Sequence, residues 1–176
     1  MVRPRYVAHV KLAVGDMVVY GTHGIGRVVA REEQVVLGAT REVVVVELQD
    51  GLTVTLPLGR ARSQLRPLAT EADVRQVRDA LREDRALSVD PWLSRRRETV
   101  EKMTGGDPVR LAELVSEGAQ RERMRLAKSG KQQLSPGERE VFVKARKLLA
   151  GEIALALGMQ PAAADGWIDD QLARPG

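Results

Sequence analysis

The sequence predicts an α+β protein of two domains, in which a small N-terminal β-barrel precedes a C-terminal all-α helical bundle. Several short apolar segments before residue 69 are separated by glycine-rich turns, as is typical of a small, strongly bent barrel. After Pro67 the pattern changes, and apolar residues recur at helical spacing with mostly short connections. The predicted divisions are a flexible lead-in at residues 1–11, the barrel at 12–68, the helical domain at 69–160, and a short helix and tail at 161–176.

Composition restricts the possible classes of protein. The 176 residues suffice for one medium domain or two small ones, and the scarcity of aromatic residues requires aliphatic cores. The chain has no cysteine, which excludes disulfides and thiolate metal sites. No apolar run reaches membrane-spanning length and no signal peptide opens the chain, so we expect a soluble, cytoplasmic protein that does not contact a membrane.

Positive charge is concentrated in one internal segment. The chain carries a net charge of +4, whereas residues 91–150 alone carry a net +6. Such a segment favours a polyanion or an acidic protein face as its partner, although an ordinary Lys/Arg-rich helix surface gives the same count.

The first strand and the loop after it are predicted from residue type. Residues 17–20 (MVVY) form a short strand, and extended structure resumes at residues 27–31. Gly21, Gly24 and Gly26 are expected to form a loop between the two. The Gly24-Ile25-Gly26 sequence lacks the helix, the Lys and the Ser or Thr of a phosphate loop, so we interpret it as a turn.

A hairpin completes the predicted barrel. The valine run of residues 42–48 (EVVVVEL) indicates a strand that is buried on both faces or paired with a partner. Asp50-Gly51 is a turn signal, and residues 52–56 (LTVTL) alternate as a half-buried strand does. Pro57 is expected to end this strand.

Capping signals define the predicted helices. Thr70 is the expected N-cap of a helix whose apolar face carries Val74, Val77 and Leu81. A helix from Pro91 should end at Gly105-Gly106. The remaining signals are the start at Asp107-Pro108, the stop at Ser129-Gly130, the capping box Ser135-Pro136-Gly137-Glu138, and a short helix at 161–173 docked by Trp167 and Ile168.

The segment PWLSRRRETVEKM, residues 91–103, combines a large ring with clustered cations. Trp92 is expected at the N-terminus of a helix, followed by Arg95, Arg96 and Arg97. Arginines bind phosphates, and an indole stacks on bases or inserts between them. The alternative is a tryptophan that packs beneath the bundle and arginines that form a solvated face. Because successive helical residues differ by about 100°, the arginines cannot all point one way, and we expect Arg96 to face elsewhere.

Both halves of the sequence resemble the CarD/CdnL family of bacterial transcription regulators. The N-terminal resemblance lies in VGDMVVYGTHGIGRV, in the hairpin around Asp50-Gly51 and in LTVTLP. The C-terminal resemblance lies in PWLSRRRETVEKM, GDPVRLAELV and LSPGEREVFVKARKLLAGEIALALG, so that roughly residues 12–158 are covered. The resemblance implies a Tudor/SH3-like barrel that binds RNA polymerase and a helical domain that contacts promoter DNA. Transcription-repair coupling factors have a related barrel, but their helicase motifs are absent from this sequence.

The resemblance also implies the DNA contacts. Trp92 matches the family's wedge tryptophan, which contacts the minor groove at the upstream edge of the transcription bubble. Arg95 and Arg97 lie on the family's basic helix, and Arg139 matches a position that reaches the DNA backbone. We therefore expect these four residues to bind promoter DNA with little base specificity and to stabilise the open promoter complex.

On the polymerase side, the family's barrel uses arginines on its exposed strands to contact the β subunit of RNA polymerase. The matching places in this sequence are Gln34 and Thr55, and Arg41 lies nearby. The implied interface consists of Gln34, Arg41, Val43, Thr53 and Thr55. Pairing through the backbone of an edge strand does not depend on these side chains.

Two other classes of protein compete with this interpretation. The first is an interaction adaptor, whose barrel binds a different partner and whose basic helices bind an acidic protein surface. The second is an enzyme. His9 lies in the lead-in and His23 in a glycine-rich turn, and neither has a carboxylate cluster, nucleophile motif or metal spacing beside it. We therefore expect no catalytic residue, cofactor or metal, and a protein that acts as a monomer.

Overall fold

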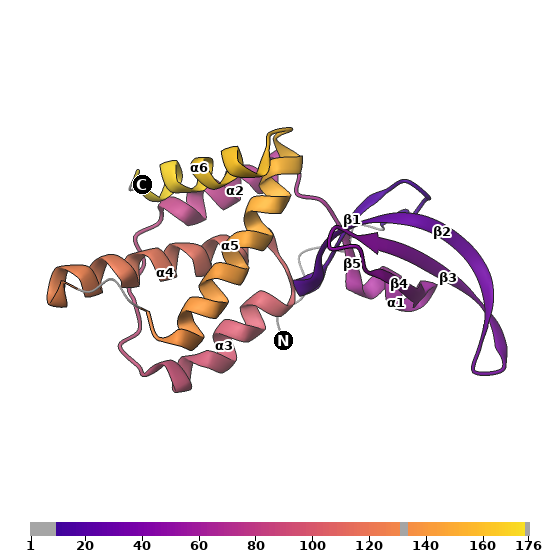
Figure 1. Ribbon diagram of the computed structural model, residues 1–176, viewed down its shortest axis with the longest axis horizontal. Coiled ribbons are helices and arrows are strands. Elements are labelled where there is room, and N and C mark those ends of the chain that lie inside the picture. The colour runs from indigo at the N-terminus through magenta and orange to yellow at the C-terminus, as the bar shows by residue number, and fades with distance from the viewer. Residues whose placement is uncertain (1–9, 131–133, 175–176) are drawn as a thin grey trace. The chain divides into compact units, whose positions relative to one another are not determined.

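The computed structural model describes residues 10–130 and 134–174 and divides into two compact units between Leu68 and Ala69 (Figure 1). An antiparallel sheet forms the N-terminal unit and helices form the C-terminal unit, which confirms the α+β class. Of the lead-in predicted for residues 1–11, residues 1–9 lie outside the described residues. Val10 packs against the core of the sheet.

Five strands form the sheet of the N-terminal unit. Their order is β4-β3-β2-β1-β5, with every neighbouring pair antiparallel. The strands β4 and β5 are the two edges, and no ladder joins them within the described ranges, so closure into a barrel stays a prediction. The elements are β1 (Met17–Tyr20), a 3₁₀ turn (Gly21–His23), β2 (Gly24–Val36), β3 (Ala39–Leu48), β4 (Thr53–Pro57), α1 (Leu58–Gln64) and β5 (Leu65–Pro67).

The core of this unit is aliphatic, as the composition predicts. Val18, Val28, Val44 and Val46 are completely buried in it. The valine run occupies the middle of β3, and the strand is buried on both faces there, because Val43, which points to the face opposite Val44, is only 1% exposed. Burial on both faces therefore explains the valine run, and pairing with a binding partner is not needed to explain it.

The loop predicted across Gly24 and Gly26 is wrong. The turn is complete at His23, and β2 already begins at Gly24, which has a φ of 85°. Gly26 is part of the ladder and lies opposite Leu48 on β3. A Cβ at Gly26 would lie 2.6 Å from Val46 Cγ1 and 3.0 Å from the Glu47 carbonyl oxygen. This glycine therefore allows two strands to approach closely and does not mark a loop.

The distal part of the β2–β3 hairpin is a two-stranded ribbon. Residues 33–36 pair with residues 39–42, whereas β1 pairs with β2 only as far as Arg27 and β4 pairs with β3 only as far as Val43. A bulge at residues 28–30 precedes the ribbon. The turn at its tip consists of Leu37 and Gly38, both with positive φ, and Leu37 is 99% exposed.

Two elements of the N-terminal unit are not predicted by the sequence. The helix α1 is seven residues long and β5 is three residues long, so neither is long enough to show a period. Both depend on tertiary packing, since Ala61 of α1 and Leu65 of β5 are buried in the aliphatic core.

The C-terminal unit consists of five helices that confirm the predicted capping signals. Thr70 and Asp73 form a capping box on α2, Asp107 Oδ1 accepts from the first-turn amides of α4, and Ser135 and Glu138 form a capping box on α5. Gly130 ends α4 with a φ of 65°. The helices are α2 (Glu71–Arg82), α3 (Trp92–Thr104), α4 (Pro108–Ser129), α5 (Pro136–Ala156) and α6 (Pro161–Leu172).

The helices pack around a second aliphatic core. The central helices α4 and α5 contact each other, with α2 and α6 on one side and α3 on the other (Figure 1). Leu111, Leu149, Ile153 and Ile168 are almost fully buried, and Trp167 packs against them as predicted. No helix within the described ranges combines the length and apolarity needed to cross a membrane.

Replacement of Gly26 by alanine should destabilise the N-terminal unit. The added methyl group would overlap Val46, so we expect a loss of about 1–3 kcal/mol in the free energy of unfolding, measured by chemical denaturation. The matched control is Gly59→Ala in α1, where a Cβ meets no atom within 4 Å and alanine is the better helix former. Equal stability of the two variants would contradict the close approach at Gly26.

Candidate functional site

Trp92 is the first residue of α3, as predicted, and its indole is half-buried. On one side the ring packs against Gly137 in the first turn of α5, where a Cβ would lie 2.6 Å from the indole Nε1. On the Arg95 side, the guanidinium carbon lies 5.7 Å from the ring centroid. A small cavity of about 30 Å³ adjoins the ring and is lined in part by Leu114 and Phe142. The indole is therefore held by the protein while part of its surface remains open.

Arg95 has protein partners on three segments. Its Nε donates to the Asp90 carbonyl oxygen at 2.9 Å, and its terminal nitrogens form ion pairs with Glu138 of α5 and, at 3.4 Å, with Glu117 of α4. The side chain is only 11% exposed. These contacts connect the start of α3 to both central helices.

Glu138 is the buried centre of this network. Its carboxylate accepts hydrogen bonds from the amide and hydroxyl of Ser135 at 3.0 and 2.8 Å and pairs with both Arg95 and Arg125. Burial alone would raise the pKa of Glu138. The Ser135 hydrogen bonds, the Arg95 hydrogen bond and the charge of Arg125 outweigh burial and lower this pKa to about 2. The carboxylate of Glu138 is thus charged at neutral pH.

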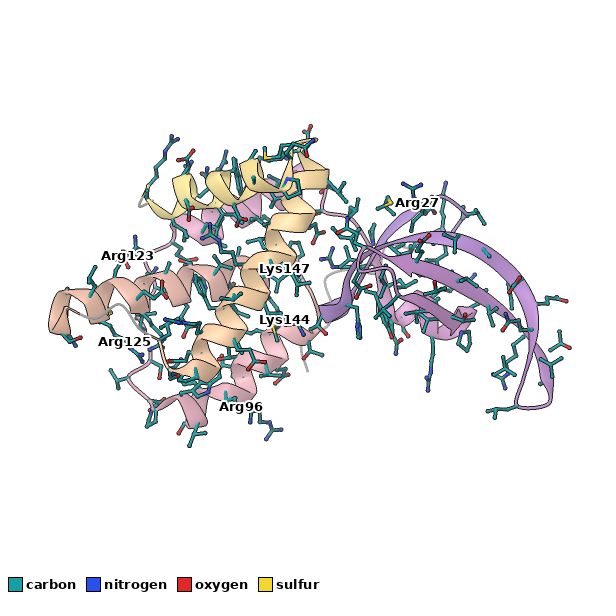
Figure 2. All side chains as sticks on the ribbon, in the orientation of Figure 1. Arg27, Arg96, Arg123, Arg125, Lys144 and Lys147 are labelled. Atoms are coloured by element: carbon teal, nitrogen blue, oxygen red, sulfur yellow. The ribbon has the colours of Figure 1, made fainter. Side chains whose placement is uncertain are left out.

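Of the three consecutive arginines, Arg95 is the one whose guanidinium is held by other groups of the protein. Arg96 and Arg97 are both exposed, and Figure 2 shows Arg96 pointing away from the bundle. At about 100° per residue, Arg96 lies about 40° around the helix from Trp92, on the same side. Local periodicity could not indicate the contacts of Arg95, because its partner Glu138 is 43 residues away. The expectation that Arg96 faces elsewhere than the other two arginines stays a prediction. The DNA contact predicted for Arg95 stays a prediction.

Exposed cations continue along α5. Arg139 is exposed just after the capping box, and Lys144 and Lys147 follow it on the same helix (Figure 2). None of the three forms an ion pair with a residue in the described ranges. The sequence analysis identifies Arg139 but not the two lysines, although their place in the basic segment is a signal that could have indicated them.

The residues predicted to contact the polymerase share one face of the sheet. Gln34 lies opposite Arg41 in the β2–β3 ladder, and Thr55 lies opposite Val45 in the β3–β4 ladder. Because side chains alternate along a strand, Gln34, Arg41, Val43, Thr53 and Thr55 all belong to this face. The register thus brings together residues from three strands.

Their exposure separates these residues into two groups. Thr53 and Thr55 are exposed on the edge strand β4, and Gln34 and Arg41 are exposed on the ribbon. Val43 is only 1% exposed, so its side chain supports the face from within. Arg27 is a further exposed residue here, opposite Glu47 and in the same row as Thr53. The sequence analysis missed Arg27, because a face can be assigned only after the bulge at residues 28–30 is known.

Only one of the two histidines, His23, lies in the part of the chain that the structure describes. His23 stacks on Tyr20 with ring centroids 4.8 Å apart, and His9 lies outside the described residues. No group of three His, Cys, Asp or Glu side chains in residues 10–130 and 134–174 is arranged to hold a metal ion.

The N-terminal unit thus presents exposed polar residues on one face of its sheet, and the helical unit presents a half-exposed tryptophan near exposed cations, which is typical of proteins that bind other macromolecules. Family models match both parts of the chain. The CarD-like/TRCF RID domain matches residues 12–69, and the CarD C-terminal domain matches residues 76–169. The chain therefore belongs to the CarD family, whose members are regulatory proteins that interact with RNA polymerase.

The pKa of Glu138 predicts how stability depends on pH. Because the folded-state pKa is lowered to about 2 from 4.5, the stabilisation is complete above about pH 4.5 and is lost as the pH falls towards 2. At pH 7 we expect Glu138→Gln to lower the free energy of unfolding by on the order of 3 kcal/mol, and this difference should shrink between pH 5 and about 2.

Denaturation of the two proteins over this pH range provides the measurement. The control is Glu140→Gln, which removes the same charge from an exposed position of α5 and should change the free energy of unfolding by less than about 0.5 kcal/mol. A pH-independent difference between wild type and Glu138→Gln would show that the carboxylate charge is not stabilised in the folded state.

Proposed function

We propose that this protein connects RNA polymerase to promoter DNA and stabilises the open promoter complex. In this proposal the N-terminal sheet, closed as a Tudor-like barrel, binds the polymerase β subunit, and the helical unit binds DNA at the upstream edge of the transcription bubble. The observation that carries the proposal is the half-exposed Trp92, held at the start of α3 beside the exposed Arg96, with the exposed Arg97 further around the same helix.

The proposed mechanism needs no catalytic group. An indole fills the gap that an unstacked base step leaves, so it binds distorted DNA better than intact duplex. A ligand that prefers one of two states shifts the equilibrium towards that state by its difference in affinity. Insertion of Trp92 at the edge of the bubble would therefore prolong the melted state of the promoter.

The exposed cations supply attraction to phosphates. Arg97 and Arg139 were expected from the sequence, and the exposure of Arg96 supports its addition to this group. Phosphate contacts carry no base identity, which agrees with a regulator of little sequence specificity. The partners of Arg95 within the protein favour a supporting role for this residue.

The polymerase contact is assigned to the exposed face and edge of the sheet. Thr53 and Thr55 lie on β4, whose outer edge is unpaired within the described residues and is available for strand addition. Arg41 and Arg27 provide cations on the same face, although not at the places where the family has them. Val43 supports this face from within the sheet.

Replacement of Trp92 by alanine should abolish the stabilisation of the open complex. Loss of a stacked aromatic ring costs about 1–3 kcal/mol, so the lifetime of the complex on a weak promoter should fall at least about fivefold relative to wild type. The measurement is the decay of open complexes formed with purified cognate polymerase. The control is Leu93→Ala, the neighbouring exposed residue, which should leave the lifetime unchanged.

The same experiment separates this proposal from the adaptor hypothesis. If wild type and Trp92→Ala act alike and neither binds polymerase, the N-terminal unit has another partner, and the adaptor hypothesis becomes the better one. If the protein binds polymerase but Trp92→Ala does not change the lifetime of the open complex, the wedge role of Trp92 is rejected and the polymerase contact is retained.

A negative charge on the proposed face should weaken polymerase binding. Thr55→Glu changes an exposed residue beside the open edge, and we expect at least a fivefold lower affinity for the polymerase or its isolated β-subunit fragment, measured by calorimetry. Thr40→Glu is the matched control, because Thr40 is equally exposed on β3 but points to the opposite face. Equal effects of the two substitutions would contradict the assignment of the face.

A further inference from the structure

We propose that Arg95, Gly137 and Glu138 form a supporting cluster that fixes the orientation of the Trp92 indole, and that these are positioning residues and not DNA contacts. The inference rests on the proposed role of Trp92 in open-complex stabilisation and assigns the residues that prepare Trp92 for it. Three independent features of the cluster carry the argument.

The first feature is a glycine where the helix would favour another residue. Gly137 lies in the first turn of α5, outside the set of glycines with positive φ, so the backbone does not require it. Glycine within a helix is less favourable than alanine. The indole of Trp92 occupies the place of the missing side chain, because a Cβ would lie 2.6 Å from Nε1. The packing of the Trp92 indole therefore requires a glycine at position 137, and the backbone of the helix does not.

The second feature is that the guanidinium of Arg95 binds groups of the protein itself. Its guanidinium is shared among the Asp90 carbonyl and the carboxylates of Glu117 and Glu138. Rotation of Arg95 towards a phosphate would remove a partner from Glu138, which is buried and charged, and such a loss is costly. Arg95 therefore stays beside the indole.

The third feature is that one carboxylate orders both groups that lie beside the ring. Glu138 accepts from the amide and hydroxyl of Ser135, which orders the turn that contains Gly137. The same carboxylate pairs with Arg95, whose guanidinium lies 5.7 Å from the ring centroid. A change at Glu138 should therefore loosen the Arg95 and Gly137 contacts together.

A preset orientation increases the affinity of the wedge for DNA. Ordering one large side chain at an interface costs an amount that corresponds to roughly a two- to tenfold change in the binding constant. In the supporting cluster the indole is already ordered when the protein folds, so this cost is not incurred again on binding DNA. Variants that release the indole should lose this factor although every phosphate contact is intact.

The first test uses the free protein and does not depend on polymerase. In a Trp167→Phe background, Trp92 is the sole tryptophan, and acrylamide quenching of its fluorescence reports its accessibility. We expect Gly137→Ala and Glu138→Gln each to raise the quenching constant at least about 1.5-fold. Gly166→Ala in α6 is the matched control, because a Cβ there meets no atom within 4 Å. Unchanged quenching in both variants would overturn the supporting cluster, whatever Trp92→Ala does to the open complex.

The second test distinguishes positioning from direct DNA contact through the sign of an effect. On a DNA duplex with an unpaired internal segment, removal of a negative charge at Glu138 would strengthen binding if the residue acted only through electrostatics. The supporting cluster requires the opposite, a two- to tenfold weaker binding of Glu138→Gln. Tighter binding, or no change, would overturn the proposal.

The salt dependence of DNA binding distinguishes a positioning role of Arg95 from a direct phosphate contact. Loss of a phosphate contact lowers the slope of log K against log salt by about one unit. We expect this decrease for Arg97→Ala, whereas Arg95→Ala should weaken binding with an unchanged slope. A decrease of one unit for Arg95→Ala would make it a DNA contact and reject its positioning role.

Gly137→Ala keeps the proposal testable if the Glu138 variant does not fold. It introduces no charge and improves helix propensity, so thermal denaturation should show an intact helical unit. Higher quenching together with a shorter open-complex lifetime would support both the cluster and the wedge. Higher quenching in these variants, combined with no effect of Trp92→Ala on the lifetime, would reject the wedge and leave the supporting cluster established.

Discussion

The helical unit depends on one buried carboxylate. Glu138 completes the capping box of α5 and forms ion pairs with Arg95 of α3 and Arg125 of α4. Its carboxylate therefore connects three helices. A buried charge is costly unless it is fully paired, and this requirement restricts the arrangement of its partners. The position of the Trp92 indole follows from that arrangement, because the ring lies beside both Arg95 and Gly137, and Glu138 orders both.

The two units present different kinds of surface. The sheet offers a polar face and an open edge, where recognition can use backbone groups as well as side chains. The helical unit offers a half-exposed indole and several exposed cations, which under the proposed function would attract a nucleic acid without reading its sequence. In that proposal the protein would change the lifetime of a melted promoter, which would assist an unstable complex and delay escape from a stable one. The direction of regulation would then depend on the promoter.

Local signals were sufficient for much of the fold. The caps at Thr70, Asp107 and Ser135 were predicted because a cap is complete within four residues. The protein partners of Arg95 were not predicted, because Glu117 and Glu138 lie on other helices. Gly26 was placed in a loop because its reason, the approach of Val46, is visible only when β2 and β3 are paired. The supporting cluster around Trp92 likewise combines segments that no short motif connects.

The ribbon of the β2–β3 hairpin has a consequence for how the N-terminal unit meets a partner. Its residues pair with each other but with no third strand in the part of the chain that the structure describes, and two-stranded β-structure is marginally stable in water. Local opening of this segment therefore requires less free energy than opening of the central sheet. Gln34 and Arg41 lie on it, so a partner that covered this face would also stabilise the ribbon against local opening. Part of the binding free energy would then be used to order the protein, which would lower the affinity obtained from a given contact area and allow the complex to dissociate readily.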